Sequence, residues 1–114
     1  MEQLIDTIET VIKAYTEMIP REVIQIILFG SFARGEATIY SDVDLALVRE
    51  GQTPPIRGLG WELKEQIEQA LMPLHRKVGW FNTSEANLAQ AEELFNTNTR
   101  IKKEGIVVWK RTVT

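Results

Sequence analysis

The sequence contains no cysteine and only one histidine, His75. Without cysteine the chain can form no disulfide, offers no thiol nucleophile and provides no thiolate to a metal ion. A single histidine also excludes a zinc centre built from several histidines. A disulfide-stabilised scaffold and thiol chemistry are therefore both excluded.

Long apolar runs are missing as well. The longest, Ile26–Phe29, is far shorter than the roughly 20 residues that span a bilayer. Residues 1–20 carry four acidic side chains, which is not the pattern of a signal peptide. We therefore expect a cytoplasmic protein without a membrane-spanning segment.

The sequence also lacks a strong positive charge. Of its 114 residues, 44% are hydrophobic and 25% are charged, and the formal net charge is -3. This is ordinary globular composition, and the length predicts a single domain over residues 1–114. The acidic balance argues against binding that depends on neutralising nucleic-acid phosphates, so we expect no direct contact with nucleic acid.

Hydrophobic periodicity predicts a mixed α+β domain. Apolar residues recur at helical spacing from Leu4 to Ile19, and the β-branched run at 23–29 is typical of a strand buried on both faces. Further predicted elements are a strand at 42–48, a helix at 63–74, a strand at 77–81, a helix from a Thr83 or Ser84 cap through Phe95, a helical turn at 100–104 and a short last strand at 106–109. The order α-β-β-α-β-α, with that last strand, predicts a small mixed sheet flanked by helices.

The stretch between the first two predicted strands carries the most chemistry. Gly30 permits a sharp turn, and a helix that starts at Ser31 would present free N–H groups and a hydroxyl to phosphate oxygens. Asp42 and Asp44 are two residues apart on the next strand, so both carboxylates lie on one face with Cα atoms about 6.5–7 Å apart. Two such hard oxygen ligands suit Mg²⁺, which binds carboxylates together with substrate phosphates and water. A phosphate-binding turn beside two carboxylates that can bind Mg²⁺ is typical of enzymes that transfer phosphoryl or nucleotidyl groups.

These residues resemble the signature of a known family. The segments Gly30-Ser31, Ala33-Arg34-Gly35 and Ser41-Asp42-Val43-Asp44-Leu45 are similar to those of the minimal nucleotidyltransferases, within the polymerase-β-like nucleotidyltransferase superfamily. The resemblance implies the nucleotidyltransferase fold and transfer of a nucleoside monophosphate from ATP or another triphosphate to a hydroxyl. It also implies Gly30 and Ser31 at the phosphates, and Asp42 and Asp44 as catalytic ligands of Mg²⁺.

The same resemblance implies a partner. Family members of this length commonly lack a substrate-binding domain and pair with a separately encoded helical protein. In the best understood pairing that protein is a HEPN-type ribonuclease toxin, and the nucleotidyltransferase is the antitoxin that AMPylates it. A tailing polymerase fits poorly, because the chain has neither the length for a nucleic-acid-binding domain nor the basic charge.

The sequence departs from the family pattern at a third carboxylate. The family usually carries it on the strand after the second helix, where this chain reads His75-Arg-Lys-Val-Gly-Trp-Phe81. We expect nucleotide binding to survive and transfer to be lost or slowed, unless Glu85 or Glu36 substitutes. The alternative function is a catalytically impaired homologue that neutralises or regulates its partner by contact alone.

Several other side chains have a structural as well as a functional interpretation. Arg34 either binds nucleotide phosphates or pairs with Glu36 or another acid at the surface. We expect Ser41 to close a local turn and His75 to belong to a solvated basic edge. Large aromatic side chains are expected in the core, at a partner surface or at a homodimer contact; these are Trp61, Trp80, Phe81 and Trp109.

Overall fold

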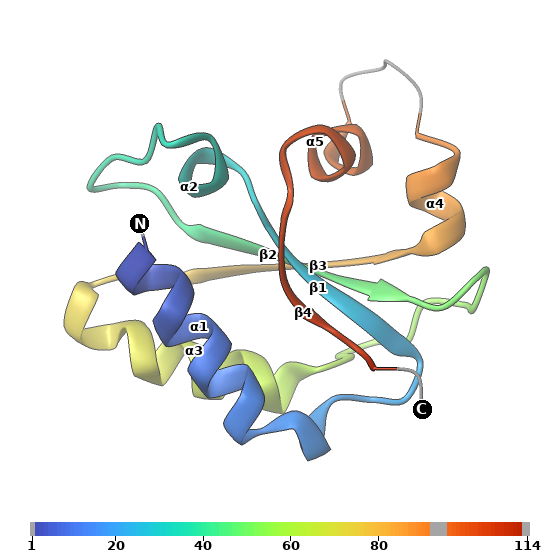
Figure 1. Ribbon diagram of the computed structural model, residues 1–114, viewed down its shortest axis with the longest axis horizontal. Coiled ribbons are helices and arrows are strands. Elements are labelled where there is room, and N and C mark those ends of the chain that lie inside the picture. Colours follow the sequence, from blue (N-terminus) through green and yellow to red (C-terminus); the bar gives the residue numbers. More distant parts are fainter. Residues whose placement is uncertain (1, 92–95, 113–114) are drawn as a thin grey trace.

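The computed structural model describes residues 2–91 and 96–112 (Figure 1). Helices and strands alternate along most of the chain. In chain order the elements are α1 (Glu2–Ala14), η1 (Thr16–Met18), β1 (Val23–Phe29), α2 (Ser31–Arg34), β2 (Val43–Arg49), α3 (Trp61–Leu71), η2 (Met72–Leu74), β3 (Val78–Ser84), α4 (Glu85–Ala89), α5 (Thr97–Glu104) and β4 (Ile106–Lys110). The predicted order is therefore confirmed, and the last strand is present.

The four strands form one mixed sheet with the order β3-β2-β1-β4. Strand β1 is antiparallel to both β2 and β4, whereas β2 and β3 are parallel. A parallel pair needs a crossover connection, and α3 provides it. Helices α1 and α3 cover one face of the sheet, and α4 and α5 lie on the other (Figure 1).

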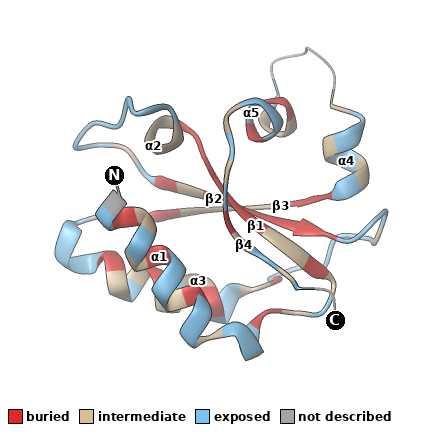
Figure 2. Ribbon diagram, viewed as in Figure 1, coloured by how far each residue is buried: buried red, intermediate tan, exposed pale blue. Residues whose placement is uncertain are grey.

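Both faces of the two central strands are buried, as the sequence predicts for 23–29 (Figure 2). Along β2 the side chains alternate between two apolar clusters. Val43, Leu45 and Leu47 belong to the larger cluster, which includes the inner sides of α1 and α3. Ala46 and Val48 belong to a smaller cluster beneath α4 and α5. The alternation places Asp42 and Asp44 on the α4–α5 side of the sheet.

Several element boundaries differ from the prediction. The helix predicted at 63–74 is α3 followed by the 3₁₀ turn η2, and the strand predicted at 42–48 is Val43–Arg49. Helix α1 ends at Ala14 and the chain continues to Pro20 through the 3₁₀ turn η1. Strand β3 continues beyond Phe81 to Ser84, because it pairs with β2 residue by residue up to Arg49.

The predicted cap at Ser84 is confirmed, since its hydroxyl accepts a hydrogen bond from the Asn87 N–H at 3.1 Å. Helix α4 then ends at Ala89. The part of the predicted helix that contains Leu94 and Phe95 lies outside the described residues. No helix in the described part of the chain is long and apolar enough to cross a membrane.

Candidate active site

The turn after β1 has the backbone that the sequence predicts. Gly30 has φ 79° and ψ -157°, a conformation that is essentially restricted to glycine. Helix α2 starts at Ser31 and closes at Gly35, which is left-handed. The first N–H groups of α2 have no partner within the helix, and the Ser31 hydroxyl has none among the described residues.

Asp44 lies between Gly79 of β3 and Gly30, the residue that follows β1. A Cβ atom added at Gly30 would collide with its Oδ2, and one added at Gly79 would come within 2.5 Å of its Oδ1. The sheet register explains this, because Phe29 and Gly79 are the two pairing partners of Asp44. The carboxylate is thus held beside the turn that begins α2.

The environment of Asp44 raises its pKa above the usual range of an aspartate. The main cause is burial, and the charge of Asp42 acts in the same direction. Arg100 and Arg34 lower it in part. Asp42 is itself exposed, so the two carboxylates have different surroundings although they lie on one face.

The register identifies Gly79 as the residue beside Asp44 on β3. This is the strand on which the resemblance implies a third carboxylate, and the position carries no side chain. Arg76 lies in the loop before this strand. Its guanidinium donates to the carbonyl oxygens of Thr38 and Ser41, at 2.7 and 3.0 Å.

The two acids considered as substitutes have other partners. Glu85 follows β3 at the far end of the sheet, where its Oε1 accepts the Gly51 N–H at 2.8 Å. Glu36 accepts from Nε of Arg34 at 3.1 Å. Among residues 2–91 and 96–112, no three carboxylate or histidine side chains gather closely enough to hold a metal ion together.

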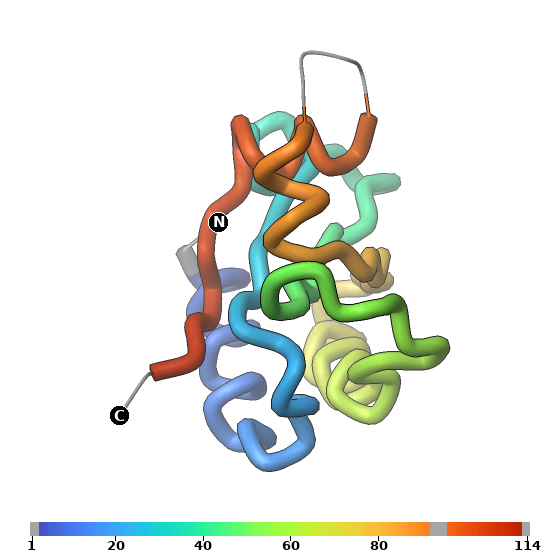
Figure 3. Tube along the Cα trace, turned by 90° about the vertical axis from the view of Figure 1, so that its right-hand side faces the viewer, coloured from blue at the N-terminus to red at the C-terminus, as the bar shows by residue number. Residues whose placement is uncertain are grey.

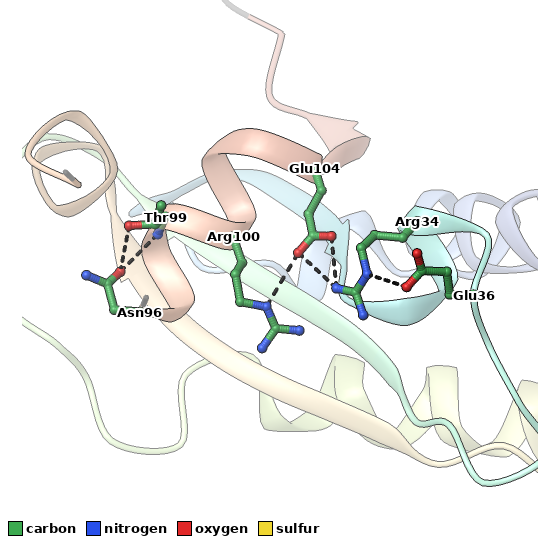
Figure 4. Close-up of polar contacts among 6 residues, drawn as sticks. All are labelled: Arg34, Glu36, Asn96, Thr99, Arg100 and Glu104. Atoms are coloured by element: carbon green, nitrogen blue, oxygen red, sulfur yellow. Dashed lines mark hydrogen bonds and ion pairs between the residues drawn. The ribbon is translucent and has the colours of Figure 1, made fainter. Parts of the chain in front are cut away.

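The predicted phosphate ligand Arg34 is engaged by two carboxylates (Figure 4). Its Nη1 donates to both oxygens of Glu104, at 2.9 and 3.1 Å. Nε of Arg100 also donates to Glu104, at 3.4 Å. Helix α5 therefore brings a second arginine and a carboxylate to the site, and neither was singled out from the sequence.

The sequence pattern around Arg100 and Glu104 does not indicate that these residues lie at the site. They lie about sixty residues beyond Asp42 on a helix that also carries Lys102 and Lys103, which looks like an ordinary solvated face. Arg76 was likewise missed as a supporting residue. Its hydrogen bonds to Thr38 and Ser41 stabilise the loop before Asp42. Its guanidinium carbon lies over the Phe32 ring, 4.8 Å from the ring centroid.

The remaining candidates have mainly structural contacts. The Ser41 hydroxyl accepts from the Thr38 N–H at 2.8 Å, so the predicted local turn is confirmed. His75 is exposed and ends η2. The Trp80 indole donates to the Leu59 carbonyl at 2.9 Å, whereas Trp61 is 51% exposed beneath Nζ of Lys64.

Asp42 and Asp44 fit a magnesium ion that arrives with a nucleotide. Both are hard oxygen donors, and Mg²⁺ is commonly held by one or two carboxylates plus phosphates and water. With Gly79 beside them they do not form a three-carboxylate cage.

The chain is similar to known proteins in its sequence family and in its fold. The family model described as a nucleotidyltransferase domain matches residues 8–107. No curated protein matches the chain significantly.

Several solved structures share the fold. A candidate nucleotidyltransferase from Sulfolobus solfataricus is 17% identical, with a TM-score of 0.60 over 96% of this chain and 82% of that chain. A chain of a toxin–antitoxin complex with AMP-PNP is 20% identical, with a TM-score of 0.56 over 94% of this chain and 73% of that one. A chain from the complex of a tri-AMPylated HEPN toxin and an MNT antitoxin of Shewanella oneidensis is 22% identical, with a TM-score of 0.51 over 97% and 74% of the two chains.

At such identities these structures show a common fold, and the predicted nucleotidyltransferase fold is confirmed. The family model, in contrast, covers most of the sequence, including the Gly30 turn and both aspartates. The chain therefore belongs to the nucleotidyltransferase domain family.

Proposed function

We propose that this domain binds a nucleoside triphosphate, ATP, with Mg²⁺ and transfers its nucleoside monophosphate to a hydroxyl group. The observation that carries the proposal is the position of Asp44, whose carboxylate lies against the turn that starts α2. Phosphate ligands and a metal-binding carboxylate are thereby side by side. The single domain over 1–114 is proposed to supply this whole site.

The residues of the chain have separate roles in this proposal. Gly30 leaves the backbone open to the phosphates, Ser31 donates its hydroxyl, and Arg34 supplies positive charge after leaving Glu104. Asp42 and Asp44 would hold Mg²⁺, which when bound offsets the negative charge of the triphosphate. The acceptor oxygen forms a bond to the α-phosphorus, its proton passes to solvent, and the bond to pyrophosphate breaks.

The acceptor is proposed to be a tyrosine hydroxyl of a separately encoded helical HEPN-type partner, with this chain as the antitoxin. Two of the structures that share the fold support the proposal, since one is a toxin–antitoxin complex with AMP-PNP and the other contains an AMPylated HEPN toxin.

Calorimetric titration with ATP, with and without Mg²⁺, tests the nucleotide site. We expect binding that requires Mg²⁺ and is lost in the double variant Asp42→Asn/Asp44→Asn. The variant Asp6→Asn, which changes an exposed carboxylate of α1, serves as the control and should bind as the unaltered chain does. Binding that is equal in the presence and absence of both aspartates would refute the proposed site.

Gly79 supports a second candidate function, regulation of the partner by contact alone. Because Gly79 pairs with Asp44 and has no side chain, this position of β3 supplies no general base for the transfer step, and a general base typically contributes about 10²–10⁴-fold. Co-expression with the partner and mass spectrometry separate the two functions. A nucleotide adduct that disappears in Asp44→Asn supports transfer, whereas a tight complex without an adduct supports contact alone.

A further inference from the structure

A cavity of about 350 Å³ lies at the opposite end of β2 from the aspartates. The loop after β2 lies beside α4 (Figure 3). Residues of this loop, of α4 and of the ends of the parallel strands β2 and β3 line the cavity. Arg49 and Ser84, the last residues of these strands, are paired in register and both line it. The carboxyl ends of adjacent parallel strands are a frequent location for ligands in open sheets.

Arg49 is the unusual member of this lining. The residue is only 2% exposed, and its Nε donates to the Thr53 carbonyl at 3.1 Å. Its Nη1 is buried and has no hydrogen-bond partner in the part of the chain that the structure describes. A buried cation with unmatched donors is destabilising unless an anion or acceptor completes it.

No described carboxylate neutralises this guanidinium. None of the ion pairs formed among residues 2–91 and 96–112 includes Arg49. The neighbouring Glu50 is exposed, and Glu85 is bonded to the Gly51 N–H. The other described lining residues are uncharged, among them Gln52, Thr53 and Asn87.

We propose that this cavity binds a small oxyanion, the carboxylate or phosphate group of a metabolite-sized molecule, and that Arg49 is its principal ligand. The planar guanidinium matches both groups with two parallel donors. The volume lies within the range of small-molecule sites, at its lower end. No described residue of the wall carries a negative charge.

The walls of the cavity are already held in place. The Ala86 N–H donates to the Gly51 carbonyl at 3.0 Å, and the Ser84 hydroxyl accepts from Asn87 at 3.1 Å. The site is also separate from the nucleotide site, since five residues of extended strand place Arg49 about 16 Å from Asp44. The inference therefore does not depend on the proposed nucleotidyl transfer.

The test is a titration of the isotope-labelled full chain with potassium phosphate and, separately, with potassium acetate, each against potassium chloride at equal ionic strength. We expect saturable shifts of the Arg49 Nε–H signal and of the amides at 50–53 and 84–90. A response to phosphate alone assigns a phosphate ligand, and a response to acetate assigns a carboxylate. Shifts confined to residues 30–36 would report the other site and would overturn the inference.

Three variants make the test specific. In Arg49→Met we expect the affinity for the anion to fall by at least about tenfold. Arg49→Lys should retain part of this affinity, because lysine keeps the positive charge but lacks the two parallel donors of the guanidinium. Ala86→Leu fills the cavity without altering Arg49 and should also abolish the response, which keeps the test valid if Arg49→Met does not fold. Binding that is unchanged in Ala86→Leu would overturn the inference.

Glu92 and Glu93 follow Gln90 closely in the sequence and provide a decisive control. If the double variant Glu92→Gln/Glu93→Gln responds to the anions and the unaltered chain does not, then one of these two acids already neutralises Arg49, and the inference is wrong. Equal responses of this variant and the unaltered chain support an external ligand.

Discussion

The carboxylate of Asp44 lowers the stability of the fold at neutral pH. Its raised pKa means that the folded chain holds this proton more tightly than the unfolded chain does. As the pH rises through the interval between the unfolded value, about 4, and the higher folded value, the unfolded state releases its proton first. The free energy of unfolding therefore decreases across this interval and then stays low.

Asp44→Asn should accordingly be more stable than the unaltered chain at pH 7, and this difference should shrink as the pH falls to about 4. The measurement is urea denaturation at both values. Asp6→Asn is again the control, with an expected change within about 0.5 kcal/mol at both pH values. A variant at position 44 that is less stable at pH 7 would contradict the assignment of burial as the main influence on this carboxylate.

Gly79 determines how many carboxylates surround the site. Gly79→Asp would add a third carboxylate to Asp42 and Asp44, and the Asp44 side chain must also rotate away from the new Cβ atom. Without metal we expect this variant to be less stable than Gly79→Asn, which has the same shape, by about 1 kcal/mol. With Mg²⁺ the order should reverse, because a third oxygen ligand becomes available.

Thermal denaturation of both variants with and without Mg²⁺ checks this reversal. Transfer to a co-expressed partner should increase in Gly79→Asp by up to about 10²–10⁴-fold, the usual contribution of a general base, and should not increase in Gly79→Asn. An equal response of the two variants to Mg²⁺ would show that position 79 is not part of the metal site.

At the scale of elements, α5 controls the availability of Arg34. Glu104 binds this arginine through both carboxylate oxygens, so a phosphate must displace it. In Glu104→Gln we expect MgATP affinity to rise by up to about fivefold, the equivalent of a surface ion pair worth at most about 1 kcal/mol. Calorimetry measures the change.

Glu36→Gln is the matched comparison, since Glu36 meets the same arginine through a single contact and is more exposed. Its effect should be smaller. If Glu104→Gln instead weakens binding, then Glu104 positions Arg34 for the nucleotide and does not compete with it.

The sequence predicts those elements whose signals are local. Strand β1, the glycine turn, the start of α2 and the Ser84 cap each depend on a few adjacent residues, and each is confirmed. The sequence alone does not identify which residue lies next to Asp44 on β3, because the register depends on how α3 returns the chain to the sheet. Arg100 and Glu104 could not be placed, since only tertiary packing brings α5 over α2.

At the scale of the whole molecule, the two faces of the sheet differ in the apolar material that covers them. Among the described residues, sixteen buried side chains form the cluster on the α1–α3 side and five form the cluster on the α4–α5 side. A smaller buried cluster implies a lower free energy of local opening. We therefore expect the face that carries the candidate site to be the less stable one.

Hydrogen exchange followed by mass spectrometry or nuclear magnetic resonance tests this difference. We expect amides of α5 to exchange at least about tenfold faster than those of α3, which buries Leu63, Ile67 and Leu71. Because α5 carries Arg100 and Glu104, its opening would change the charges around Asp44. Equal protection of the two helices would mean that α5 is fixed to the sheet by more than this cluster.

The glycine beside Asp44 has a consequence for the gene as well as for the protein. Every glycine codon becomes a codon for aspartate or glutamate by one change at its middle base. A single point mutation at position 79 therefore separates this chain from one with an acidic residue beside Asp44. On the proposed function, one genetic step of this kind would separate a protein that acts on its partner by contact alone from one that transfers a nucleotide to it.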